Sequence, residues 1–327
     1  MGTTTTRITA EDFLTPPEFS RWTLATSLAG RIGGVRLELA PSRDETSFSQ
    51  CYQQIPLRVL PPFRFGPGQP SLVYLLNPTA GLMDGDAHLI EIRARGGARA
   101  LVTGQSATRI HPASHGFSTQ QWHIHVEGDA VLVVLPGPAI PFQGTRYYQH
   151  VRIDLENGGR LIWGDLWYAG RYARGEISER FQFETLIQDF TVHRGRHLVF
   201  RDRFAWQGPW DAEAATWHFG THNCCGSLFV TGNIEESLIA EKKDRQMSLF
   251  PTKAGDTCLR WLGSSQNVAE GLVTTALKIA GILSGGQSSK PWLLPFHHLA
   301  PNHWFVPAYS LSLRELTRDS TSDTSLR

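Results

Sequence analysis

Residues 72–110 read LVYLLNPTAGLMDGDAHLIEIRARGGARALVTGQSATRI, and this stretch decides the fold. It begins with a short apolar run over residues 72–76, which is followed by an Asn-Pro pair and two glycines that favour sharp turns. Residues 87–93 then place apolar side chains at every second position, which is typical of a β-strand. A Gly-Gly pair turns the chain before a second β-type run over residues 98–103. The stretch therefore predicts strands joined by tight turns.

The same pattern returns at a fixed distance along the chain. Gly97, Gly128 and Gly159 are evenly spaced (128 − 97 = 31 and 159 − 128 = 31), and each lies between an alternating strand and an apolar strand. A looser fourth copy is expected around Gly195. Because one such unit cannot bury its own apolar face, the period predicts stacked copies in a mainly-β protein. A plain β-meander with evenly placed glycines is the alternative.

Four segments, in this order, resemble the urease accessory protein family UreD, also called UreH. They read NPTAGLMDGD, GGARALVTGQSATRI, LPGPAIPFQGTRYYQ and GDLWYAGRYARGE, and the resemblance covers about residues 30–210. The chain departs from the family pattern at Leu82, Met83 and Asp84 in the first segment and at Gly104 in the second. Arg109 stands where the family has Lys, which keeps the charge but changes its hydrogen-bonding geometry. The motif turn residues are Gly81, Gly85, Gly97, Gln105 and Thr108.

The resemblance implies the fold: mainly β, with stacked, helically wound, β-solenoid-like sheets and a few helices in the C-terminal third. We expect a disordered tail over residues 1–20, one domain over residues 21–285, and an atypical, poorly ordered end over residues 286–327. Residues 234–247 are rich in helix formers and predict a helix. Residues 271–283 are ambiguous; the family pattern places a strand at their start and a helix after it.

Composition excludes several classes of function. With 31 basic and 30 acidic residues the net charge is +1, so no basic surplus favours nucleic-acid binding. We expect no secretory signal and no membrane span, because the first residues lack an apolar core and no apolar run approaches about 20 residues. Four cysteines in 327 residues do not form a disulfide framework. These observations favour the cytoplasm.

Residues 217–225, WHFGTHNCC, carry the strongest local metal-binding pattern. Two imidazoles and two thiols suit a borderline ion such as Ni²⁺ or Zn²⁺, although neighbouring cysteines on a strand point to opposite faces. Buried structural cysteines are the alternative. The candidate ligands are His218, His222, Cys224 and Cys225. His123 and His125 also lie two apart on one strand, as ligands would, but a solvated polar face explains them more simply.

Three acidic residues map onto acidic positions of the family pattern: Asp86, Asp165 and Glu176. A carboxylate that lines a polar internal passage could bind a cation weakly and release it, which makes these residues candidates for cation passage. The alternative is that each caps a turn or pairs with a neighbouring arginine.

The catalytic signatures for which we searched are absent: the sequence has no G-x-S-x-G elbow, no HExxH, no phosphate loop and no dinucleotide fingerprint. The resemblance implies a non-enzymatic scaffold for maturation of the urease nickel centre. Its implied partners are UreF, the GTPase UreG and apo-urease, with a dimer of the accessory complex as a further expectation. No tightly bound cofactor is expected, and nickel would be in transit. The alternatives are a β-solenoid hydrolase acting on polysaccharide and a UreD-like binding module without a urease role.

Overall fold

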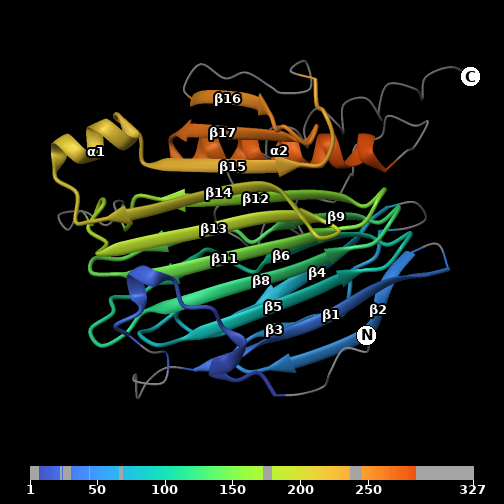
Figure 1. The fold of residues 1–327 in the computed structure, drawn as a ribbon, viewed down its shortest axis with the longest axis horizontal. Helices are drawn as coiled ribbons and strands as arrows, with labels where there is room; N and C mark the ends of the chain where they lie inside the picture. Colours follow the sequence, from blue (N-terminus) through green and yellow to red (C-terminus); the bar gives the residue numbers. More distant parts are fainter. Residues whose placement is uncertain are drawn as a thin grey trace, which may run out of the picture.

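The computed structural model describes residues 7–22, 24, 31–43, 45–65, 69–171, 179–235 and 245–284. Two β-sheets lie face to face, and helix α2 covers the outer side of one of them (Figure 1). The mainly-β prediction is confirmed. None of the helices in these ranges combines the length and the apolar content needed to cross a membrane.

The seven-stranded sheet has the strand order β14-β13-β11-β8-β5-β1-β2. Its strands β5, β8, β11 and β13 are parallel neighbours, and β1 also pairs with β5 in parallel. The bounds are β1 (Ile32–Ser42), β2 (Glu45–Gln54), β5 (Ala87–Ala94), β8 (Ser118–Val126), β11 (Arg146–Leu155), β13 (Thr185–Arg194) and β14 (His197–Gln207).

The ten-stranded sheet runs β16-β17-β15-β12-β9-β6-β4-β3, with β7 and β10 joined at its side. The bounds are β3 (Arg58–Val59), β4 (Ser71–Leu76), β6 (Arg99–Gly104), β7 (Thr108–Ile110), β9 (Val131–Leu135), β10 (Pro138–Pro141), β12 (Arg160–Tyr168), β15 (Cys224–Val230), β16 (Arg245–Pro251) and β17 (Thr257–Gly263). The helices are η1 (Ala10–Asp12), η2 (Pro17–Phe19), α1 (Ala212–Phe219) and α2 (Ser265–Leu283).

Three stacked turns carry the chain from one sheet to the other. Strands β5, β8 and β11 lie in the seven-stranded sheet, and the strands that follow them, β6, β9 and β12, lie in the ten-stranded sheet. Each turn is closed by a backbone hydrogen bond, from Ala98 to Arg95, from Ala130 to Glu127 and from Gly159 to Glu156. The predicted stacking of the flanking strands is confirmed by the parallel pairing within each sheet.

The even glycine spacing is not the structural repeat, however. The left-handed positions of the three turns are Gly97, Asp129 and Gly158, with φ of 78°, 59° and 88°. An Asp therefore occupies the position in the middle turn, and the true spacings differ from 31. The turn predicted at Gly195 is present between β13 and β14, but it is a hairpin within one sheet and not a copy of the three crossing turns.

The N-terminal segment differs from the predicted disordered tail. Residues 7–22 pack against the outer face of the seven-stranded sheet, where Ile8 and Phe19 are fully buried. The Leu14 N–H donates to Gln121 Oε1 on β8 (3.0 Å). The apolar side chains that follow the threonine run supply this packing, which outweighs the polar composition of the first residues. Residues 286–327 lie outside the described part of the chain.

Two predictions for the C-terminal third also change. The helix predicted for residues 234–247 is wrong at its end, because β16 begins at Arg245 and pairs with β17; residues 236–244 lie outside the described ranges. Met247 packs against the cluster beneath α2, so tertiary pairing overrides helix propensity there. The family-based strand at Gly271 is wrong as well, because α2 runs through it with Leu272 and Val273 buried against the ten-stranded sheet.

Candidate functional site

A buried carboxylate, Asp165, lies between the two sheets. It belongs to β12 of the ten-stranded sheet and is 4 % exposed. Gln188 Nε2 on β13 donates to Asp165 Oδ2 (2.8 Å), and Gln149 Nε2 on β11 donates to Asp165 Oδ1 (3.3 Å). The Trp163 indole N–H donates to the same carboxylate. Both glutamines come from the opposite sheet, so these hydrogen bonds join the two sheets across the interior.

Asp165 has no ion-pair partner in the described ranges, which is unusual for a buried carboxylate. Burial raises the pKa of Asp165 to about 6, and the hydrogen bonds from Trp163, Gln188 and Gln149 limit the rise. At neutral pH the group is therefore mainly ionised, and neutral amides and an indole compensate its charge. A buried anion with only neutral donors has the electrostatics of a cation site.

Asp165 is part of a complete polar layer between two apolar clusters. Pairing of neighbouring strands aligns His88 with Gln120, Gln120 with Gln149, and Gln149 with Gln188 across the seven-stranded sheet. Asp165 aligns in the same way with Ser227 and Arg260 in the ten-stranded sheet. We call this set the polar layer: His88, Gln120, Gln149, Gln188, Asp165, Ser227, Arg260 and Asp202.

A pocket adjoins the polar layer at each side. The first, of about 60 Å³, we call the turn pocket; Gln120 lies in its wall beside Gly81, Gln105, Thr108 and Arg109. Gly81, Gln105, Thr108 and Arg109 are all residues of the family-like segments. Gly81 has φ of 138°, and an added Cβ would meet the Arg109 carbonyl oxygen at 2.3 Å, so the close approach of these two segments requires glycine.

The second pocket, of about 390 Å³, we call the aromatic pocket. Trp167, Phe204, Trp206 and Phe219 contribute its aromatic wall, and Gln188, Asp202, Ser227 and Arg260 of the polar layer also line it. Arg260 and Asp202 form an ion pair there (2.6 Å). A small cavity of about 20 Å³ is lined by Asp165, Gln188 and Asp202, so it joins the carboxylate to the residues of the aromatic pocket.

The predicted metal ligands do not form one cluster. Cys224 faces α2 and is fully buried, whereas Cys225 lies on the opposite face of β15 and lines the aromatic pocket with His218. His222 lies outside that wall. Burial raises the pKa of the Cys225 thiol to about 12 and that of Cys224 well above its ordinary value, so both thiols are protonated and are poor ligands.

Asp86 caps a turn and lines none of the three pockets. It is 3 % exposed and accepts hydrogen bonds from the Arg31 N–H (2.7 Å) and the Met83 N–H (2.8 Å). Burial raises its pKa, while these two hydrogen bonds act in the opposite direction. Gly85, with φ of 82°, lets the backbone make this turn. Glu176 lies outside the described residues.

Sequence reasoning missed the partners of Asp165. Gln149 and Gln188 lie on different strands, 39 residues apart, and only strand pairing brings their amides together (3.1 Å). One local signal was present: each glutamine occupies an inward position of a strand whose following inward residue is apolar. Gln149 precedes Val151 on β11, and Gln188 precedes Phe190 on β13.

Fold and site together define a mainly-β protein of two packed sheets that encloses a polar layer around an uncompensated carboxylate. This chain belongs to the UreD urease accessory protein family, whose sequence model matches residues 31–290. The resemblance noted in the sequence is thereby confirmed.

Several relatives are similar over much of their length. "Urease accessory protein UreD" of Sporosarcina pasteurii is 30% identical over 236 residues, which are 68% of this chain and 89% of that protein. "Urease accessory protein UreD 2" of Synechococcus sp. (strain JA-3-3Ab) is 34% identical over 57% of this chain and 69% of its own length. "Urease accessory protein UreD" of Deinococcus radiodurans is 34% identical over 53% of this chain and 61% of its own length.

Proposed function

We propose that this chain is a non-enzymatic accessory protein in urease maturation, and that nickel passes through it by way of the polar layer. Membership of the family and the names of the relatives support the accessory role. The observation that carries the passage is Asp165, an ionisable carboxylate held between two sheets by neutral donors. In the cytoplasm the chain would act with UreF and UreG on apo-urease, the partners that the family resemblance implies.

The chemistry of the layer suits transit rather than storage. The Asp165 carboxylate supplies negatively charged oxygen, and the side-chain carbonyls of Gln149 and Gln188 supply neutral oxygen. Oxygen ligands bind a borderline ion such as Ni²⁺ less tightly than nitrogen or sulfur ligands do, so the ion would be released readily. A single carboxylate also keeps the electrostatic attraction modest, which a pathway with entry and exit requires.

We propose that the path ends at the two pockets. Residues of the family-like segments line the turn pocket at Gln120, and the aromatic pocket lies beside Gln188 at the other side. Strands of one sheet are spaced by about 4.8 Å, so Gln120, on β8, and Gln188, on β13, two strands away, are separated by about 10 Å. We propose the stacked turns and the wound course of β5 to β12 as the scaffold that keeps this path aligned.

The burial of Asp165 favours this function over hydrolysis of polysaccharide. A glycosidase needs two carboxylates facing a cleft that admits a sugar ring. Asp165 is 4 % exposed, and its neighbour Asp202 is bound to Arg260. Passage of a small ion requires no such opening.

Co-expression tests the partner claim. We expect the chain to co-purify with UreF as a stable complex that then recruits UreG, and to activate apo-urease when nickel is supplied. The chain without its partners should self-associate, because partner-facing apolar surface would be exposed. A monodisperse monomer that ignores UreF in size-exclusion chromatography would refute the accessory role and favour a binding module without a urease function.

A further inference from the structure

Two histidines meet on the outer face of the seven-stranded sheet, on the side opposite the polar layer. His123 lies on β8 and His150 on the neighbouring strand β11, at diagonal positions of the parallel pair. Their ring centroids are 5.8 Å apart and the rings are nearly perpendicular (89°). The N-terminal segment is hydrogen-bonded through Leu14 to Gln121, which pairs with His150 across the strands.

Each ring has a buried nitrogen without a hydrogen-bond partner among the described residues: Nε2 of His123 and Nδ1 of His150. His150 is 8 % exposed. Buried polar atoms in folded proteins are nearly always paired, so two neighbouring unpaired ring nitrogens call for a ligand. His125, two residues after His123, is different, because its Nε2 lies 3.0 Å from Glu156 Oε1.

The protonation state of His150 suits a metal ligand. Burial lowers the pKa of His150 to about 4, with a smaller contribution in the same direction from His123, so the ring is neutral at pH 7. A neutral imidazole presents a lone pair to a metal ion. Behind His123, Glu91 Oε1 lies 3.8 Å from Nδ1, and Arg36 anchors that carboxylate. A carboxylate behind a ligating imidazole orients the ring and leaves its other nitrogen free.

The spacing of the rings also agrees with a shared ion. Two imidazoles that each bind one ion at about 2.0–2.1 Å have ring centroids about 5–6 Å apart. We propose that His123 and His150 form a two-imidazole site for a borderline divalent cation such as Ni²⁺ or Zn²⁺, with water in the remaining positions. Asp189 and Glu91 nearby favour a cation and Arg152 opposes it, so the site is a moderate binder. It is separate from the polar layer and does not rest on the proposed passage.

Nickel titration of the full chain tests this site. We expect calorimetry to show one Ni²⁺ equivalent fewer, or at least about tenfold weaker binding, in His123→Ala and in His150→Ala than in the unmodified chain. His115→Ala is the control, because it removes an exposed histidine (80 % exposed side chain) that precedes β8 and is not part of the pair. Differences between variants cancel the contribution of the other histidines.

His123 is partly exposed, so His123→Ala should fold even if the more deeply buried His150 cannot be replaced. Circular dichroism and thermal unfolding verify this. Nickel stoichiometry and affinity that are the same in the unmodified chain and in folded His123→Ala would overturn the proposal, as would an equal loss in His115→Ala. Either result would assign the unpaired nitrogens to a bound water. Urease activation would be unaffected by that outcome, so the proposed function would stand.

Discussion

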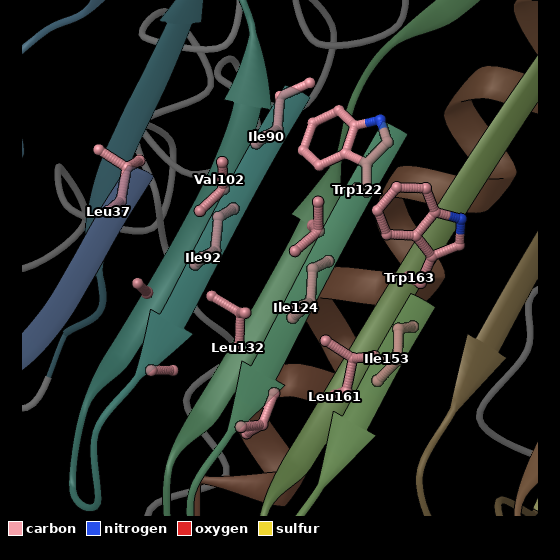
Figure 2. Close-up of a cluster of buried hydrophobic side chains, with 14 of the residues drawn as sticks. Leu37, Ile90, Ile92, Val102, Trp122, Ile124, Leu132, Ile153, Leu161 and Trp163 are labelled. Atoms are coloured by element: carbon pink, nitrogen blue, oxygen red, sulfur yellow. The ribbon is translucent and has the colours of Figure 1, made fainter. Parts of the chain in front are cut away.

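The space between the two sheets has two regions that differ in kind. Toward the stacked turns the inward side chains are mainly apolar, and Figure 2 shows Trp122, Ile124, Leu132, Ile153 and Leu161 of this cluster packed together. One row further along the same strands, the inward positions are the amides and carboxylate of the polar layer. Beyond that row, aromatic side chains close the interior again.

The comparison shows that the polar layer contributes less to stability than the apolar region does. Apolar burial stabilises by about 25 cal/mol per Å², whereas a buried carboxylate without a cationic partner destabilises the fold. Hydrogen bonds from Gln149, Gln188 and Trp163 to Asp165 limit that cost but do not remove it. Apolar residues in place of the whole polar layer would make the interior continuous, so the buried carboxylate points to a function other than stability.

The largest expected effect is in the apolar region. Trp122 is 2 % exposed and packs edge-on against Trp163, with ring centroids 5.2 Å apart. Trp122→Ala should lower the free energy of unfolding by about 3–5 kcal/mol, because it leaves a large cavity. Urea titration measures this loss. Trp217→Ala is the control: Trp217 is 85 % exposed, so its removal should change stability by less than about 0.5 kcal/mol.

The second effect has the opposite sign and lies in the polar layer. Burial raises the pKa of Asp165 from 3.8 to about 6, so the folded state holds this proton more tightly than the unfolded chain. The wild type is therefore more stable at low pH, where Asp165 is protonated, and it loses this stability as pH rises from about 4 to about 6. The free energy of unfolding of Asp165→Asn, relative to that of the wild type, should therefore increase by about 3 kcal/mol between about pH 4 and pH 7.5.

Urea titration of both proteins at the two pH values measures this gain. The difference between variant and wild type isolates Asp165 from the other titrating groups. A stability difference that does not change with pH would show that Asp165 is not charged inside the fold, and the contrast between the two regions would fail.

A smaller effect separates the two buried carboxylates. Asp86 accepts two backbone N–H groups, and Asp86→Ala leaves both without an acceptor. We expect a loss of about 1–3 kcal/mol, because the turn loses its cap. Asp86→Asn retains an acceptor oxygen and should lose less. Stability at neutral pH measures both variants; a rise in stability of Asp86→Asn like that expected for Asp165→Asn would place Asp86 with the polar layer instead.

The sequence predicted the strands and turns of the central region because alternation and glycine are local signals. It did not predict which residue of each turn would be left-handed, since Asp129 can adopt the position that Gly97 and Gly158 occupy. It also did not predict that β14 would stay in the same sheet as β13, because the choice between a hairpin and a crossing depends on which sheet edge is free.

The candidate site was predicted only in part. Asp165 was one of three acidic candidates in the family-like segments, with Asp86 and Glu176, and no local pattern ranks it above Asp86. The structure separates them by their partners: backbone N–H groups of a turn for Asp86, and side chains of the opposite sheet for Asp165. Such partners depend on strand register over long sequence distances, which no local pattern encodes.

The most direct test of the polar layer is the nickel content of urease matured with Asp165→Asn. This variant keeps the shape of the side chain and removes its charge, and it should still co-purify with UreF and UreG. We expect urease with less nickel and proportionally lower activity, although the variant itself is more stable than wild type at neutral pH. Asp154→Asn, which removes a partly exposed carboxylate on the outer face, should give normal nickel content. Full nickel loading by Asp165→Asn would contradict the account and leave Asp165 without a role in passage.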